Sequence, residues 1–237
     1  MEETNLFSDP DDFYPESPKP TFQTFSYGSI SLQMRNLGTT ALWGHVVSNA
    51  ARYLCNKIFN KTFDCNNKTI VELGSGSGLV GLFAGICGAT VCFTDYPEPK
   101  VLENIRFNCQ SNGFSKFFIQ PLIWGNPVED VIQSLGGTPD IIICSDLVFN
   151  HSCHESLAST ISSLLGPSSV AIFAFSHHRP CYVQQDLQFF EVCSSQGLFV
   201  EHFETDTSFE PLFEDESKYA GNEAVRGPVH CYLLKKT

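Results

Sequence analysis

The sequence predicts an α/β fold of the Rossmann-like kind, with about seven mostly parallel strands in one sheet and helices on both faces. Short apolar runs alternate along the 237 residues with longer segments of helical periodicity, as in strand–helix units. Residues 140–145 form the strongest run, and continuous apolar runs suit parallel strands buried on both faces. Another run ends at Glu72 and leads into glycines at 74, 76 and 78, where the backbone can approach a ligand closely.

The chain begins with an acidic segment that is rich in proline. Residues 1–20 are therefore predicted to be a flexible tail, and residues 21–237 a single domain. Residues 24–35 alternate like a β-hairpin, and a helix over 42–59 precedes the sheet. Strands are predicted at 68–72, 90–94, 117–120, 140–145, 169–175, 198–204 and 229–235. Helices are predicted at 79–87, 98–111, 153–165 and 182–195, whereas residues 203–229 follow no assignable pattern.

The glycine loop fits two classes of nucleotide-like ligand. Residues 76–81 satisfy GxGxxG, the dinucleotide pattern in which a helix N-terminus binds a pyrophosphate. Counted from Glu72, residues 72–78 read ExGxGxG, which is similar to the first motif of S-adenosylmethionine-dependent methyltransferases. A carboxylate repels a pyrophosphate, but it favours a cofactor that carries a sulfonium and an ammonium group. Glu72 therefore favours S-adenosylmethionine over a dinucleotide.

Asp95 ends the strand predicted at 90–94, roughly 20 residues beyond the glycines. At this spacing an acidic side chain accepts hydrogen bonds from the ribose hydroxyls of a nucleoside. The alternative is a turn or N-cap role ahead of Tyr96. Ligands of open parallel sheets bind beyond the carboxyl ends of the strands. Polar or aromatic residues are expected at five such ends, namely Glu72, Asp95, Trp124, Asp146 and residues 176–179.

Composition argues against several classes of function. The formal net charge is −12, which disfavours a nucleic-acid partner and leaves either a basic partner or simple solubility as its explanation. No apolar run reaches the roughly 18–20 residues that span a bilayer, and the N-terminus lacks a basic, apolar leader. The ten cysteines are scattered without metal-ligand spacing, which indicates reduced core residues. We expect a cytoplasmic monomer that binds neither membranes nor metal ions.

Several short motifs resemble, in the same order, those of the family-16-like class I methyltransferases of eukaryotes. They cover most of residues 20–205 and lie at 42–45, 72–78, 94–97, 102–104, 122–125 and 145–152. Residues 95–97, 149–152 and 178–180 are most similar to the branch that methylates translation elongation factor 1-alpha at its N-terminus and a nearby lysine. Members of that branch are also called nicotinamide N-methyltransferase-like. The resemblance implies a class I methyltransferase sheet, S-adenosylmethionine as cofactor and a protein substrate.

The resemblance also implies which residues bind the cofactor, namely Trp43, Glu72, Gly74, Ser75, Gly76, Asp95, Trp124 and Ser145. Trp43 and the glycine turn would contact the methionine end, Asp95 the ribose, and Ser145 the cofactor at the end of the central strand. A tryptophan ring offers a stacking plane, so Trp124 would contact the adenine face. The alternative for both tryptophans is ordinary packing in the core or at the rim.

Asp146 and Phe149 are the predicted catalytic residues. Residues 146–149 match the (Asp/Glu)-x-x-(Tyr/Phe) signature of the family, which implies a carboxylate that orients the acceptor amine and an aromatic wall beside it. The alternative for Asp146 is an exposed helix N-cap. Methyl transfer needs a neutral nitrogen, which at pH 7 costs about 1 kcal/mol for an α-amine and roughly 4–5 kcal/mol for a lysine. A lone carboxylate favours the charged amine, so apolar surroundings from Phe149 and Trp43 would have to oppose it.

Histidines gather in the same part of the sequence. His151, His154 and Glu155 lie close together, but their spacing differs from HExxH, so capping, packing or a place at the substrate rim is expected instead of metal binding. His177 and His178 follow a predicted strand at the functional edge, and proton transfer is an alternative to a structural role.

Three other functions stay open. One is a small-molecule N-methyltransferase with a nicotinamide-like acceptor, which needs a closed pocket, whereas a protein chain end needs an open groove. A nicotinamide-cofactor oxidoreductase needs a pyrophosphate-binding loop, which Glu72 disfavours. A non-enzymatic adaptor is disfavoured by the intact set of Glu72, Asp95 and Asp146.

Overall fold

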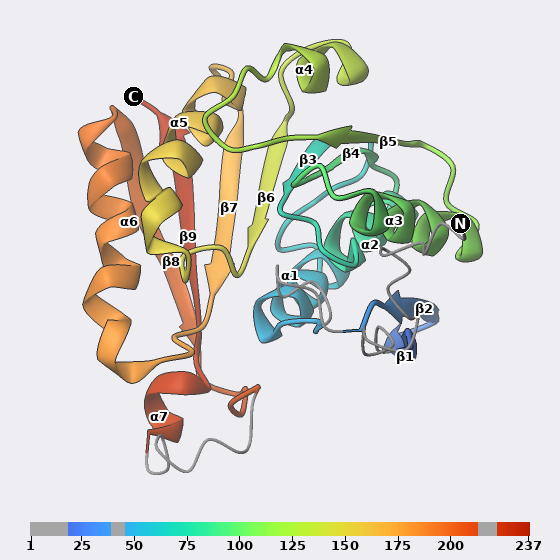
Figure 1. Cartoon of the computed structure of the whole chain (residues 1–237), viewed down its shortest axis with the longest axis horizontal. Coiled ribbons are helices and arrows are strands. Elements are labelled where there is room, and N and C mark those ends of the chain that lie inside the picture. Colours follow the sequence, from blue (N-terminus) through green and yellow to red (C-terminus); the bar gives the residue numbers. More distant parts are fainter. Residues whose placement is uncertain (1–18, 39–45, 213–221) are drawn as a thin grey trace, which may run out of the picture.

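The computed structural model describes residues 19–38, 46–212 and 222–237. Seven strands form one sheet in the order β5-β4-β3-β6-β7-β9-β8 (Figure 1). They are β3 (Thr69–Leu73), β4 (Thr90–Asp95), β5 (Phe117–Pro121), β6 (Ile141–Ser145), β7 (Val170–Phe175), β8 (Leu198–Asp206) and β9 (Val229–Lys236). Neighbouring strands are parallel except that β9 runs antiparallel to both β7 and β8. The predicted fold class is confirmed.

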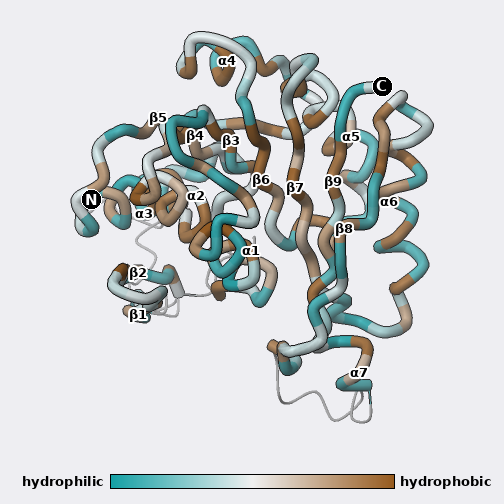
Figure 2. Tube along the Cα trace, turned by 180° about the vertical axis from the view of Figure 1, so that it is seen from behind, coloured by the Kyte–Doolittle hydropathy of each residue, from teal (hydrophilic) through white to brown (hydrophobic). Residues whose placement is uncertain are grey.

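Helices pack on both faces of the sheet. The first face carries α1 (Asn49–Phe59), α2 (Leu79–Ile86) and α3 (Pro99–Ser111), and the second carries α4 (Glu129–Leu135), α5 (His154–Leu164) and α6 (Val183–Ser195). Side chains along each central strand alternate between two cores, so that Ile142 packs on the second face while its neighbours Ile141 and Ile143 pack on the first. Figure 2 shows the resulting hydrophobic stretches along β6 and β7. Burial on both faces explains why these strands are apolar throughout.

A hairpin of β1 (Thr21–Tyr27) and β2 (Ile30–Asn36) packs against helix α3 through three asparagines spaced four residues apart. Asn104 and Asn108 each donate to the Arg35 carbonyl oxygen at 3.0 Å, and Asn112 donates to the Gln33 carbonyl oxygen at 2.9 Å. The buried Asn108 amide also donates to the carbonyl oxygen of Ser77 at 2.9 Å. Asn108 therefore ties the hairpin to the glycine loop.

Three helices differ from the sequence-based expectation. The helix predicted over 42–59 begins only at Asn49, because the Ser48 hydroxyl caps it and accepts a hydrogen bond from the Ala51 amide at 3.1 Å. The seven-residue α4 and the four-residue α7 (Glu223–Arg226) were not predicted. Both are too short for helical periodicity to stand out, and α7 lies in the segment without an assignable pattern.

Two further expectations concern the termini and the thiols. The division into a tail over 1–20 and a domain over 21–237 stays a prediction, because residues 1–18 lie outside the described residues. All ten cysteines are described and free, and seven of them are buried, which agrees with reduced core residues. Within the described ranges, no helix has both the length and the apolar character that crossing a membrane requires.

Candidate active site

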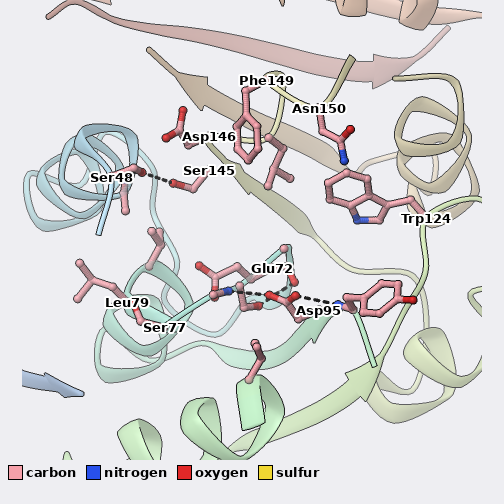
Figure 3. A pocket seen from close by; sticks show the side chains of 18 of the residues that line it. Ser48, Glu72, Ser77, Leu79, Asp95, Trp124, Ser145, Asp146, Phe149 and Asn150 are labelled. Carbon is pink, nitrogen blue, oxygen red and sulfur yellow. Dashed lines mark hydrogen bonds between the residues drawn. The ribbon is translucent and has the colours of Figure 1, made fainter. Parts of the chain in front are cut away.

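A cavity of about 710 Å³ opens at the carboxyl ends of β3, β4 and β6, where the strand order reverses. Nine of the ten predicted site residues line it, namely Glu72, Gly74, Ser75, Gly76, Asp95, Trp124, Ser145, Asp146 and Phe149. The tenth, Trp43, lies outside the described residues. Figure 3 shows Ser145, Asp146 and Phe149 grouped at the end of β6 and Glu72 beside Asp95 at the ends of β3 and β4.

The glycine loop exposes its backbone to this cavity. Gly74 has a φ of +59°, a conformation that favours glycine, and a Cβ atom there would lie 2.7 Å from Cδ2 of Leu147 and would have to push that side chain aside. Ser75 fastens the loop to β4, because its amide donates to the Thr94 carbonyl oxygen at 3.0 Å. The Gly76 amide donates to Oδ2 of Asp95 at 2.7 Å. These two hydrogen bonds connect the loop after β3 to the end of β4.

Glu72 is buried at the end of β3, with 2% of its surface exposed. Burial raises the pKa of its carboxyl to about 8, and the amides of Gly81 and Val80 at the start of α2 oppose only part of this rise. Its Oε2 atom has no well-formed hydrogen bond to any described residue. Burial thus favours the neutral carboxyl over the carboxylate that the sequence argument assumed.

Asp95 and Trp124 border the other end of the cavity. Besides the Gly76 amide, the Asp95 carboxylate accepts a hydrogen bond from the Tyr96 amide at 2.8 Å. Burial raises the pKa of Asp95, and these two amides oppose the rise. The Trp124 ring approaches Gly74, since a Cβ atom on that glycine would lie 3.5 Å from Cζ2 of the indole. The loop and the indole thus border the same part of the cavity.

Asp146 lies directly after β6 in a backbone conformation that is uncommon for a residue with a side chain. Its φ is +63°, in the left-handed region that aspartate and asparagine tolerate better than most residues, and its amide donates to the Ala174 carbonyl oxygen at 2.7 Å. Oδ2 pairs with Nε2 of His178 at 2.8 Å, whereas Oδ1 is buried without a hydrogen-bond partner among the described residues. Asp146 is not a helix N-cap, because the helices that follow begin at His151 and His154.

A second carboxylate, that of Asp186, connects the loop after β6 to the loop after β7. Asp186, buried on α6, accepts a hydrogen bond from His177 at 2.7 Å through Oδ2 and pairs with His151 at 2.7 Å through Oδ1. His154 pairs instead with the Val148 carbonyl oxygen at 2.7 Å. These histidines therefore fix the chain after β6 and β7, and within the described residues no cluster of metal-ligating side chains is found.

The geometry can be compared with known proteins. Residues 29–196 match the model of the family described as lysine methyltransferase, which is well over half of the chain. The chain belongs to the lysine methyltransferase family.

This methyltransferase has curated relatives of similar length. It is 34% identical over 245 residues to the protein N-terminal and lysine N-methyltransferase EFM7 of Candida glabrata, an alignment that covers 97% of this chain and 94% of the relative. The protein of the same name from Schizosaccharomyces pombe is 30% identical over 243 residues, with 97% and 94% covered. The predicted protein methyltransferase activity is confirmed at the level of the family.

Solved structures agree on the fold. The structure of SMU.776, a proposed methyltransferase complexed with SAH, has a TM-score of 0.61 at 15% identity and covers 93% of this chain and 57% of its own. Precorrin-6y C5,15-methyltransferase from Geobacter metallireducens has a TM-score of 0.55 at 14% identity, with 84% and 93% covered. A methyltransferase of this family and fold takes its methyl group from S-adenosylmethionine, so the predicted cofactor is confirmed.

The cavity of this methyltransferase fits such a cofactor. The turn of Gly74, Ser75 and Gly76 lines the cavity, and its two glycines carry no side chain that could fill it. Oε2 of Glu72 is buried without a full partner, which suits a positively charged or hydrogen-bond-donating ligand. The volume of about 710 Å³ also lies within the usual range of small-molecule sites.

Sequence reasoning missed several residues of this site. Ser48 lies at the start of α1, and its hydroxyl approaches that of Ser145 to 3.4 Å. The pattern Ser-Asn-Ala-Ala before a helical segment is an N-cap signal that could have found it. Asp186 carried no local signal, because its partners lie 9 and 35 residues away. His178 was noted only as a histidine at the functional edge, without its pairing to Asp146.

Proposed function

We propose that this chain transfers methyl groups from S-adenosylmethionine to amine nitrogens of a protein, with the N-terminal amine and/or a lysine of translation elongation factor 1-alpha as the acceptor. The relatives are called protein N-terminal and lysine N-methyltransferases, which supports an amine of a protein chain as the acceptor. The elongation factor rests on the resemblance of residues 95–97, 149–152 and 178–180 to the branch that modifies it.

The orientation of Asp146 is the observation that carries this proposal. Asp146 lines the cavity; one of its carboxylate oxygens is fixed by His178, and the other is buried without a partner among the described residues. An amine N–H satisfies such an oxygen, and a charge-assisted hydrogen bond there fixes the direction of the nitrogen. Phe149 lines the cavity three residues further on, with its ring 6.5 Å from that of His178. Orientation of this kind is the main aid that a displacement at a methyl group requires.

The cofactor-binding roles are also proposals. Glu72 and the turn of Gly74, Ser75 and Gly76 would hold the methionine end, and Asp95 would accept hydrogen bonds from ribose hydroxyls through its remaining lone pairs. Trp124 would stack on adenine, and Ser145 would face the cofactor beside Ser48. All these described residues line one cavity, which supports a single ligand that contacts them together. Trp43, a monomeric state and a cytoplasmic location stay predictions from the sequence.

The test is methylation of the elongation factor itself. The purified protein would be incubated with labelled S-adenosylmethionine and unmethylated elongation factor 1-alpha, and the label mapped by mass spectrometry. Parallel reactions would contain the Asp95→Ala variant, a factor whose N-terminus is acetylated, and nicotinamide in place of the factor. We expect label at the N-terminal amine or a nearby lysine, and none with Asp95→Ala. Label on nicotinamide alone, or cofactor binding without any label on the factor, would refute the proposal.

A further inference from the structure

A single carboxylate beside the acceptor amine creates an electrostatic conflict. The nitrogen must lose a proton before it can attack, yet Asp146 as a negative charge favours the protonated ammonium form. Position alone therefore does not explain how this site would prepare an amine. The structure contains a group that bears on this conflict, and it lies on the side of Asp146 away from its free oxygen.

That group is His178, three residues beyond the end of β7. Its Nε2 lies 2.8 Å from Oδ2 of Asp146, and the exposed fractions of the two side chains are 20% and 13%. The contact joins positions 32 residues apart in the sequence, so it depends on the folded sheet. Ser145 pairs with Ala174 where β6 and β7 end, and the Ala174 carbonyl oxygen accepts a hydrogen bond from the Asp146 amide at 2.7 Å, so the loops that carry the two residues begin side by side.

The charged groups around His178 favour its cationic form. Burial lowers the pKa of the imidazole, but the charge of Asp146 and its hydrogen bond raise it by more, so the net pKa is raised. Asp186 on α6 raises it further, and Arg226 on α7 lowers it. The ring of Phe149 faces the imidazole edge to face, at 6.5 Å between ring centroids. A protonated His178 beside an ionised Asp146 makes a pair whose net charge is zero.

We propose that His178 is a positioning residue that fixes Oδ2 of Asp146, turns Oδ1 to the acceptor amine, and offsets the carboxylate charge so that this amine loses its proton more readily. The inference rests on the proposed function. The bound ammonium donates a hydrogen bond to Oδ1, gives one proton to solvent and keeps its lone pair for the methyl carbon. In this step His178 acts through Asp146 and exchanges no proton with the amine.

Two variants separate the parts played by geometry and by charge. His178→Gln keeps an N–H donor near Oδ2 but carries no charge, whereas His178→Ala removes both. The kcat and KM for the acceptor would be measured from pH 6 to 10, with His202→Gln, an exposed histidine on β8, as the matched control. For His178→Gln we expect an unchanged or lower acceptor KM, and a kcat at pH 7 that falls roughly tenfold, as a shift of about one pH unit implies. As the pH rises and wild-type His178 loses its proton, the two kcat values should converge.

For His178→Ala we expect a larger loss of kcat that high pH does not restore. A merely structural histidine would instead give both variants the same loss at every pH. Equal pH profiles for wild type and His178→Gln would overturn the inference and leave the proposed function intact.

A titration tests the charge pair without any methyl transfer. The pKa of His178 would be followed by NMR in the wild type and in Asp146→Asn, which keeps a side chain that tolerates the left-handed backbone. We expect the pKa to fall in Asp146→Asn, because the carboxylate charge that raises it is removed. An unmoved pKa would overturn the charge pair. If the pKa moves while the elongation factor stays unlabelled in the wild type, the proposed function fails and the pairing of His178 with Asp146 stands.

Discussion

Replacing Glu72 by glutamine should stabilise the protein without cofactor, and by an amount that depends on pH. The pKa of the carboxyl rises from 4.5 when unfolded to about 8 in the fold, because burial penalises its charge. Between these values the folded carboxyl holds a proton that the unfolded chain has released. The contribution of Glu72 to stability is therefore fully present below pH 4.5 and is lost as the pH rises through 8.

The magnitude follows from the same two pKa values. At 1.36 kcal/mol per pKa unit, the penalty of Glu72 is about 1 kcal/mol at pH 5 and about 3 kcal/mol at pH 7. Glutamine has nearly the same shape as the neutral acid and does not titrate. The Glu72→Gln variant should therefore exceed the wild type in unfolding free energy by a difference that grows between pH 5 and pH 8.

Urea denaturation at four pH values from 5 to 8 would measure this difference, with the exposed Glu103→Gln on α3 as the control. S-adenosylmethionine should at the same time bind the Glu72→Gln variant roughly tenfold more weakly, because a hydrogen bond to a charged group contributes about 1.5–3 kcal/mol. A stability difference that stays constant with pH, or a variant less stable than the wild type at pH 8, would refute the burial argument.

Three further variants test the supports of the site. Asn108→Ala should lower the unfolding free energy by about 2–3 kcal/mol and weaken cofactor binding, because the Arg35 backbone and the Ser77 carbonyl oxygen lose their hydrogen bonds to the Asn108 amide. Asn112→Ala is its control: Asn112 bonds to Gln33 and does not contact the glycine loop, so cofactor binding should be unchanged. Gly74→Ala should abolish measurable cofactor binding in calorimetry. Gly113→Ala is its control, with a φ of +73° and no heavy atom within 4 Å of the added Cβ, and it should cost only the backbone strain of about 1–2 kcal/mol. Asp186→Asn should lower the melting temperature and the kcat together; an unchanged kcat would show that its two histidines do not position the loop of Asp146.

The sequence was informative where one residue or one short pattern determines the outcome. Glycines at fixed spacing after a buried strand predicted the loop, and the carboxyl-end rule brought Glu72, Asp95 and Asp146 together before any contact was known. These inferences rest on a property of parallel sheets: the carboxyl ends of adjacent strands meet at one edge. The switch point between β3 and β6 is a consequence of strand order, and the same order places Asp146 at that edge.

The sequence was uninformative where function depends on a partner distant in the chain. No local pattern links His178 to Asp146 or Asp186 to His151, since each pair meets only after β6, β7 and α6 have packed. The effect of burial on Glu72 was not visible in the sequence for a related reason. Burial is a property of the whole fold, and it raises the pKa of this carboxyl to about 8.

Two carboxyl groups in one cavity thus differ in what balances their charge. Within the described ranges no basic side chain pairs with Glu72, and burial raises the pKa of its carboxyl to about 8, whereas Asp146 pairs at 2.8 Å with the His178 imidazole, whose pKa its charge raises. Environments that separate two acids in this way assign them different roles. We expect a ligand that brings a positive charge to favour the ionised form of Glu72, which would couple its ionisation to cofactor binding. If His178 offsets the charge of Asp146 as proposed, Asp146 would orient an amine without adding excess negative charge to the site.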